Sequence, residues 1–260
     1  MNEMLKASIY LKGILPLMED LVAFDQTAAQ AIKGKRLILQ FEIKNGPSAH
    51  IIIRDGTICH GTGKHPLPSV RLTFKTPDLF NRMFEGEDVR PGLRKGIPHL
   101  YFLIKKFPIL ADRLTYYLEG AGKNATDPAV IDFQVKIGLH AMLCGMAAVA
   151  TDDPDLRNIA DSTPFGTLLI NVLPDGPFGT FSKIRQNGNF IFSVSFNQPV
   201  KHANAVMEFA SADVAKQLID GKLNAVTTIG LGKDIKIGGL LPLIDKASIF
   251  LYQFDKVINN

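Results

Sequence analysis

The reactive side chains that lie closest together in the sequence are Cys59, His60 and His65, in the segment CHGTGKH. A thiol beside two imidazoles could bind a metal ion or act as an activated nucleophile. Structural metal sites draw their ligands from paired clusters, and the sequence contains no second cluster of this kind. We therefore predict that these histidines are exposed on a hairpin loop and that the protein holds no metal.

Glycines in the C-terminal part of the chain invite comparison with a nucleotide-binding loop. The spacing of Gly230, Gly232, Gly238 and Gly239 does not match G-x-G-x-x-G, and no strand–helix–strand pattern precedes them. The sequence also lacks the Gly-x-Ser-x-Gly elbow, the H-E-x-x-H pair and the Walker motif. These observations predict a protein that is not an enzyme and needs no cofactor.

The composition is that of an ordinary globular chain of 260 residues, with 46% hydrophobic and 21% charged residues. The presence of 17 Phe with no Trp is unusual. Phe supplies a large apolar area without a polar atom that needs a partner. The composition therefore favours either a Phe-rich packed core or an apolar cavity.

The charge distribution bears on the kind of partner. The formal net charge is +4, and the densest basic region contains Arg90, Arg94, Lys95, Lys105 and Lys106. Nucleic-acid binding would need a concentrated basic patch with interleaved aromatic residues, which the sequence lacks, so we predict no nucleic-acid partner. The charge is compatible with weak contact to an anionic membrane surface, or with a solvated basic face.

The number of cysteines and the hydropathy of the chain bear on the cellular compartment of the protein. Only Cys59 and Cys144 are present, so there is no disulfide framework, which indicates a reducing compartment. The N-terminal residues lack the apolar run of a signal peptide. The longest apolar stretch, residues 138–150, is too short to span a bilayer. We expect a cytoplasmic protein.

Hydrophobic periodicity predicts helices and strands in alternating groups. A helix is expected from Pro16 to Gly34, a long apolar helix over residues 128–150 and a terminal helix over residues 240–250. Strands with hairpin turns are expected between and after these helices. For residues 99–106 the periodicity fits either a fifth strand or a helix.

Two segments of the chain resemble each other. LTFKTPDLFNRMFEG at residues 72–86 corresponds to MEFASADVAKQLIDG at residues 207–221. A spacing of 135 residues joins Phe74 to Phe209, Asp78 to Asp213 and Gly86 to Gly221. Residues 120–126, GAGKNAT, form the best linker between the two copies. The sequence therefore predicts an internal duplication.

The segment EFASADVAKQLIDGKLNAVTTIGLGKDIKIGG resembles the hallmark of the sterol carrier protein 2 (SCP-2) lipid-binding family. The resemblance covers about residues 165–254 and, more weakly, about residues 37–118, where EDVRPGLRKGIPHLYFLI replaces the expected spacer and strand. It implies an α+β fold of two tandem SCP-2-like repeats, each a five-stranded, mostly antiparallel sheet covered by helices. Residues 1–122 form the divergent first repeat, and residues 123–260 form the second, which is closer to the family pattern.

The resemblance also implies a function, which is the non-catalytic binding and, as an extension of it, the transfer of fatty acids, acyl-CoA, phospholipids or sterol-like molecules in an apolar tunnel. In the second repeat, the implied lining residues are Phe190, Phe192, Phe196, Met207, Phe209, Leu218, Val226, Ile229, Leu240, Leu243 and Ile244. In the first repeat, they are Phe74, Phe80, Met83, Phe84, Leu100 and Phe107. The alternatives are an accessory module for a lipid-metabolising enzyme, with no ligand cavity, or an enzyme that acts on acyl-CoA or sterol substrates.

Overall fold

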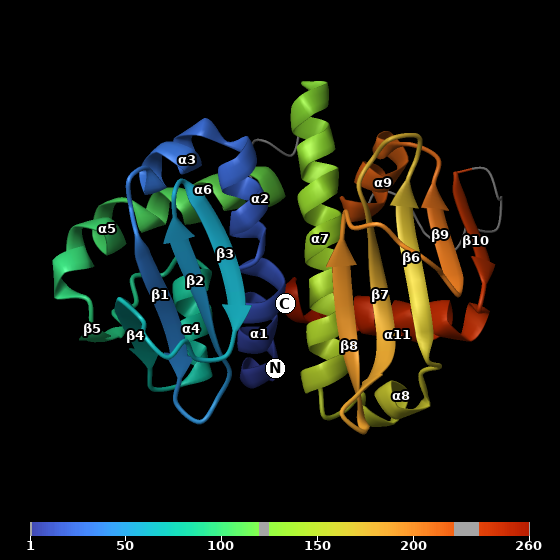
Figure 1. Ribbon diagram of the computed structural model, residues 1–260, viewed down its shortest axis with the longest axis horizontal. Coiled ribbons are helices and arrows are strands. Elements are labelled where there is room, and N and C mark those ends of the chain that lie inside the picture. Colours follow the sequence, from blue (N-terminus) through green and yellow to red (C-terminus); the bar gives the residue numbers. More distant parts are fainter. Residues whose placement is uncertain (1, 120–124, 221–233, 260) are drawn as a thin grey trace. The chain divides into compact units, whose positions relative to one another are not determined.

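The computed structural model describes residues 2–119, 125–220 and 234–259, and the chain divides into two compact units, Met1–Ala121 and Gly122–Asn260. Both units combine a five-stranded sheet with helices, which confirms the α+β class (Figure 1). Each unit has its own sheet and its own buried apolar residues.

The first unit begins with helices, continues with four strands and returns to helices. Its elements are α1 (Glu3–Ile9), the π-helix η1 (Tyr10–Ile14), α2 (Leu17–Phe24), α3 (Gln26–Ile32), β1 (Leu37–Ile43), β2 (Ser48–Arg54), β3 (Thr57–Thr62), β4 (Val70–Phe74), α4 (Pro77–Phe84), β5 (Gly92–Lys95), the 3-10 helix η2 (Ile97–His99), α5 (Leu100–Lys105) and α6 (Phe107–Leu118). The open question about residues 99–106 is thereby decided in favour of helix, and the fifth strand lies earlier in the chain, at β5.

The second unit follows a similar plan. Its elements are α7 (Pro128–Asp152), α8 (Arg157–Ser162), β6 (Gly166–Val172), β7 (Phe178–Gln186), β8 (Asn189–Phe196), β9 (Ala205–Phe209), α9 (Ala212–Ile219), β10 (Ile235–Gly239) and α11 (Leu241–Ile258). The terminal helix is therefore longer at its C-terminal end than the predicted residues 240–250.

The two sheets have the same strand order. The first runs β3-β2-β1-β4-β5, and the second, read from its other edge, runs β8-β7-β6-β9-β10. In each sheet the first strand is central, and it pairs in parallel with the fourth strand and antiparallel with the second. The sheets are therefore mixed, and the prediction of mostly antiparallel sheets is corrected. The reason is that the chain crosses back after the first three strands to place the fourth beside the first.

A buried aspartate breaks the helix that the sequence predicts from Pro16 to Gly34. Asp25 leaves the helical conformation, with φ −89° and ψ 115°, and divides the segment into α2 and α3. Its carboxylate accepts a hydrogen bond from the Ala28 N–H at 2.7 Å, which caps α3. Arg113 of α6 donates to the same carboxylate at 2.6 Å. A buried charged cap with a half-buried arginine partner therefore replaces the continuous helix.

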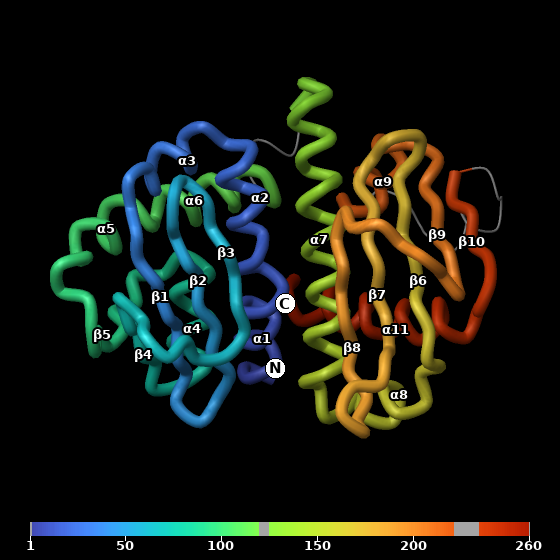
Figure 2. The backbone as a smooth tube through the Cα atoms, viewed as in Figure 1, coloured from blue at the N-terminus to red at the C-terminus, as the bar shows by residue number. Residues whose placement is uncertain are grey.

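Helices α7 and α11 cover one face of the second sheet. Helix α7 contacts β7 and β8, while α11 contacts β6, β9 and α7. The trace in Figure 2 shows α11 crossing behind the strands of this unit. Two glycines of α7 allow close approach, because a Cβ at Gly145 would collide with the Phe254 ring and one at Gly138 would lie 2.9 Å from Ile219.

Helix α7 has 25 residues, which makes it longer than the apolar stretch at residues 138–150. Among the described residues it is the one helix that passes a length and hydropathy test for crossing a membrane. Within its most apolar window, 72% of the residues are buried in the protein. A core helix of this length passes the same test.

Candidate functional site

The inner face of the second sheet carries a stripe of phenylalanines on its edge strand, β8. The register of β8 against β7 puts Phe190, Phe192 and Phe196 on one face, opposite Arg185, Lys183 and Gly179. The same face continues through Leu168, Ile170 and Val172 of β6, which are all buried. The phenylalanines of β8 are only half-buried, although they lie on the covered face.

Phe192 is the centre of an aromatic cluster in the second unit. Its ring centroid lies 5.3 Å from that of Phe181, 5.6 Å from that of Phe250 and 5.9 Å from that of Phe190. Phe181 and Phe250 are fully buried, and α11 supplies the second of them. At the far end of the stripe, the His140 ring of α7 stacks on Phe196 at 4.5 Å. The stripe is therefore held from behind while its outer side remains partly open.

A cationic hollow lies at the Phe190 end of the stripe. Its volume is about 370 Å³, which lies at the small end of the range for small-molecule sites. It is lined by Arg157, Phe165, Arg185, Gly188, Asn189 and Phe190. The Arg185 guanidinium lies 4.6 Å from the Phe165 ring centroid, and the Arg157 guanidinium lies 5.5 Å from that of Phe190. Two cations flanked by aromatic faces are suited to an anionic group that carries apolar surface.

Lys183 lies beneath this hollow and is 2% exposed. Its ammonium donates to the backbone carbonyls of Ala160, Asp161 and Thr163 at 2.7, 2.9 and 2.8 Å, at the C-terminal end of α8. Burial lowers the pKa of Lys183, and Asp161 opposes that shift. Because its protons are used by the carbonyls, Lys183 ties α8 to β7. The cations left to meet a ligand are Arg185 and Arg157, and Arg157 also forms an ion pair with Asp161 at 3.3 Å.

On the same face of the sheet, β9 and β10 also carry apolar side chains that are partly exposed. Met207 is half-buried, whereas Ala205 and Phe209, which share its face of β9, are buried. Its partner across the strand pair is Ile237 of β10, which is 39% exposed. An apolar side chain that is open in the middle of a strand, between buried neighbours, marks a place where a ligand could add cover.

The predicted lining residues of the second unit fall into three groups. Phe209, Leu243 and Ile244 are buried, and Phe190, Phe192, Phe196, Met207, Leu218 and Leu240 are half-buried. Val226 and Ile229 lie outside the described residues. Sequence reasoning did not include Phe181, Phe250, Phe165 or the two arginines. The alternation of Phe178 to Arg185 could have indicated Phe181, but the arginine positions depend on the fold.

In the first unit the predicted lining phenylalanines pack into an aromatic core, whereas the predicted Leu100 faces solvent. The ring of Phe41 lies 6.4, 6.2 and 6.0 Å from the rings of Phe80, Phe84 and Phe107. Phe80 in turn contacts Phe74 at 5.1 Å and Phe84 at 4.6 Å. Phe41, Phe74 and Phe80 are buried, Met83, Phe84 and Phe107 are half-buried, and Leu100 is 44% exposed. Rings at these distances fill the space between the sheet and its helices.

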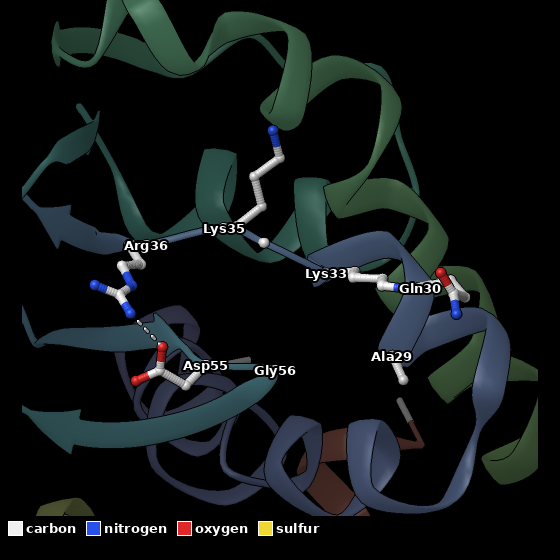
Figure 3. Close-up of a pocket in the computed structure, with 8 residues that line it drawn as sticks. Ala29, Gln30, Lys33, Lys35, Arg36, Asp55 and Gly56 are labelled. Atoms are coloured by element: carbon white, nitrogen blue, oxygen red, sulfur yellow. Dashed lines mark hydrogen bonds and ion pairs between the residues drawn. The ribbon is translucent and has the colours of Figure 1, made fainter.

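A second hollow lies on the first unit and is polar. Its volume is about 420 Å³, and it is lined by Ala29, Gln30, Lys33, Gly34, Lys35, Arg36, Asp55 and Gly56 (Figure 3). Arg36 and Asp55 form an ion pair across it at 2.7 Å. None of the predicted lining residues contributes to this hollow, which therefore offers no continuation of the aromatic core.

Cys59, His60 and His65 do not come together at one site. The prediction that both histidines are exposed on a hairpin loop is wrong, because His60 lies within β3 and both residues are half-buried. Cys59 is exposed, whereas His60, its neighbour on β3, points to the other face, where its Nε2 lies 2.8 Å from the Leu11 carbonyl oxygen. The His65 ring lies 5.1 Å from that of His50. Within the described ranges no group of three or more His, Cys, Asp or Glu side chains is placed to hold a metal ion.

The fold and the site define an α+β protein of two units, each with a mixed five-stranded sheet. No family model matches the chain, and no curated protein matches it. Among solved structures, it is similar to the apo form of sterol carrier protein 2 from Yarrowia lipolytica, with 18% sequence identity and a TM-score of 0.28. The match covers 42% of this chain and 91% of that protein.

Proposed function

We propose that the second unit binds lipids that have an acidic head group, and that it does so without transforming them. The apolar chain lies against the phenylalanine stripe of β8, and the head group lies at Arg157 and Arg185. The observation that carries the proposal is the continuity of the two features, since Phe190 belongs both to the stripe and to the cationic hollow. The resemblance of residues 165–254 to the SCP-2 family points to the same class of ligand.

The energetics support a binder of moderate affinity. Removing about 300 Å² of apolar ligand surface from water gains about 7 kcal/mol before ordering costs, at about 25 cal/mol per Å². Charge-assisted hydrogen bonds from a guanidinium contribute about 1.5–3 kcal/mol each when they replace water. Together these terms correspond to affinity in about the micromolar range after the costs of association.

The first unit is proposed to share an ancestor with the second but to bind no ligand. The identical strand order and the 135-residue correspondence of Phe74 with Phe209 support the duplication. The packed rings around Phe41 support the loss of a cavity. This unit fits the alternative reading from the sequence, an accessory or interaction module.

We retain the cytoplasm as the proposed location, because both cysteines are free thiols.

The first experiment compares a fluorescent fatty acid with the fatty alcohol of the same chain length. Substitution of Arg157 and Arg185 together by Met should weaken binding of the acid about tenfold, since about 1.4 kcal/mol corresponds to each factor of ten. Binding of the alcohol should change less than about twofold. The matched control is Arg36→Met, because Arg36 lies in the polar hollow of the first unit.

A second experiment tests lipid binding at the phenylalanine stripe of β8 against the alternative of an accessory module with no ligand cavity. Phe192→Asp should abolish uptake of both ligands while the circular dichroism of the protein is retained. Mass spectrometry of the purified wild-type protein should find co-purified lipid. If there is neither co-purified lipid nor saturable binding, the accessory-module reading is favoured. If Phe192→Asp unfolds the unit, the stripe is solid core and the lipid proposal fails.

A further inference from the structure

An apolar stripe faces solvent on the first unit, over η2 and α5. The exposed fractions of its side chains are 77% for Ile97, 44% for Leu100, 67% for Tyr101 and 57% for Ile104. These positions follow i, i+3, i+4 and i+7, so they share one side of the helical segment. We call these four residues the α5 patch. Four large apolar side chains exposed side by side mark an interaction surface rather than ordinary surface variation.

The α5 patch is fixed to the unit from its other side. Phe102 is 2% exposed, and its ring lies 6.4 Å from that of Phe107 at the start of α6. Helix α5 contacts both η2 and α6, and β5 lies close to it at the edge of the unit (Figure 1). The patch is therefore presented by an anchored helix and is not the loose end of a loop.

The charge around the α5 patch has one sign. Residues 89–111 contain Arg90, Arg94, Lys95, Lys105 and Lys106 and no Asp or Glu. All of these cations are exposed except Lys106, which is half-buried. Across the part of the chain that the structure describes, no salt bridge joins any of them to a carboxylate. The segment thus carries a local charge that exceeds the formal net charge of +4 of the whole chain.

We propose that the α5 patch is a docking site for the surface of a bilayer that contains anionic lipids. Aliphatic side chains and a tyrosine on one side of a helix, flanked by Lys and Arg, match the boundary between acyl chains and head groups. Anionic head groups supply the complementary charge, which the cations of this segment do not find within the described protein. A protein partner would need to match a surface of a single charge sign with carboxylates of its own. This proposal is independent of ligand binding by the second unit.

The chain offers a clean spectroscopic probe, because it contains no Trp. In the full-length Tyr101→Trp variant, the new indole is the sole tryptophan and is expected to emit at shorter wavelength when vesicles of phosphatidylcholine and phosphatidylserine are added. The matched control is Leu67→Trp, since Leu67 is 75% exposed and lies outside the α5 patch. Its emission should not shift. An unchanged emission of Tyr101→Trp while the protein binds the vesicles would overturn the proposal.

Vesicle sedimentation separates the apolar and electrostatic contributions. Tyr101→Ser combined with Ile104→Ser should weaken partitioning about tenfold or more, because membrane affinity scales with the apolar area buried. Lys105→Gln combined with Lys106→Gln should weaken it about fivefold or more and reduce its salt dependence. The control pair Lys33→Gln and Lys35→Gln removes two cations elsewhere on this unit and should change partitioning less than about twofold.

Three outcomes would overturn the assignment. The first is partitioning that is equal in the wild type and in the Tyr101/Ile104 variant. The second is binding to neutral phosphatidylcholine vesicles that is as strong as binding to anionic ones. The third is concentration-dependent self-association in light scattering that Tyr101→Ser and Ile104→Ser abolish, because the α5 patch would then be covered by a second copy of the chain.

Discussion

The ammonium nitrogen of Lys183 lies 4.2 Å from the ring centroid of Phe190, on the inner face of the second sheet. The same nitrogen lies 5.0 Å from the ring centroid of Phe165. Lys183 therefore sits between the two aromatic rings of the cationic hollow while it donates to the carbonyls at the end of α8. This single side chain connects the helix, the sheet and the proposed head-group site.

We predict that Lys183→Met destabilises the second unit by about 1–3 kcal/mol, because buried carbonyls lose their donor. Arg185→Met, on the same face but exposed, should change the free energy of unfolding by less than about 0.5 kcal/mol. Urea denaturation followed by circular dichroism measures both. Equal effects of the two substitutions would mean that the Lys183 contacts contribute nothing specific.

A second prediction concerns Asp25, which joins α2, α3 and α6. Burial would raise the pKa of Asp25, but hydrogen bonds from Arg113, the Ala28 N–H and Tyr117 outweigh it and hold the pKa below the ordinary 3.8. A carboxyl whose pKa is lower in the folded state contributes stability above its unfolded pKa, and that stability is lost as the pH falls through the folded value. We therefore expect the first unit to lose stability below about pH 4.

The test of this prediction is Asp25→Asn, which removes the titrating group. At about pH 7 the variant should be less stable by about 1–3 kcal/mol, and its stability should depend less on pH in the acid range than that of the wild type. Tyrosine fluorescence during urea denaturation is a suitable probe, since four of the 5 tyrosines lie in the first unit. A parallel acid dependence in both proteins would contradict the assignment.

A third prediction uses the corresponding caps of the two units. The Thr76 hydroxyl accepts from the Leu79 N–H at 3.4 Å, and the Ser211 hydroxyl accepts from the Val214 N–H at 3.3 Å. Thr76→Ala and Ser211→Ala should each cost about 1 kcal/mol, in the unit that contains the cap. Ser248→Ala, an exposed position inside α11, should cost nothing, because Ala is the stronger helix former. Destabilisation by the Ser248 control would show that the effect is not one of capping.

A fourth prediction compares two glycines of α7. Gly145→Ala should destabilise the second unit by about 1–3 kcal/mol, because the new methyl group meets the Phe254 ring in the contact between α7 and α11. Gly138→Ala should cost less than Gly145→Ala, because the Ile219 side chain that it meets belongs to a residue that is 42% exposed and can shift outward, and because Ala is the stronger helix former. Thermal unfolding of both variants checks the difference, and the reverse order would contradict this account of the packing.

Local patterns in the sequence predicted much of the fold. In β4, Val70, Leu72 and Phe74 are buried and alternate with partly exposed residues, a period of two that is visible in the sequence without any tertiary information. Thr76 and Asp127 cap α4 and α7, and such caps are recognisable in a sequence because each acts on residues within one turn. The predicted helix through Asp25 was wrong because its true partner, Arg113, lies far away in the sequence.

The sequence by itself predicted the α+β class, through its resemblance to a known family, and the shared face of Phe190, Phe192 and Phe196, through their alternation. Only the tertiary structure decided which faces are filled, because filling depends on side chains that come from distant elements. It packed Phe41, Phe74 and Phe80 into a buried core and left Phe190 half-buried beside Arg157. It also kept Tyr101 and Ile104 in solvent. Periodicity assigns a direction to a side chain, whereas contacts between remote segments assign its neighbours.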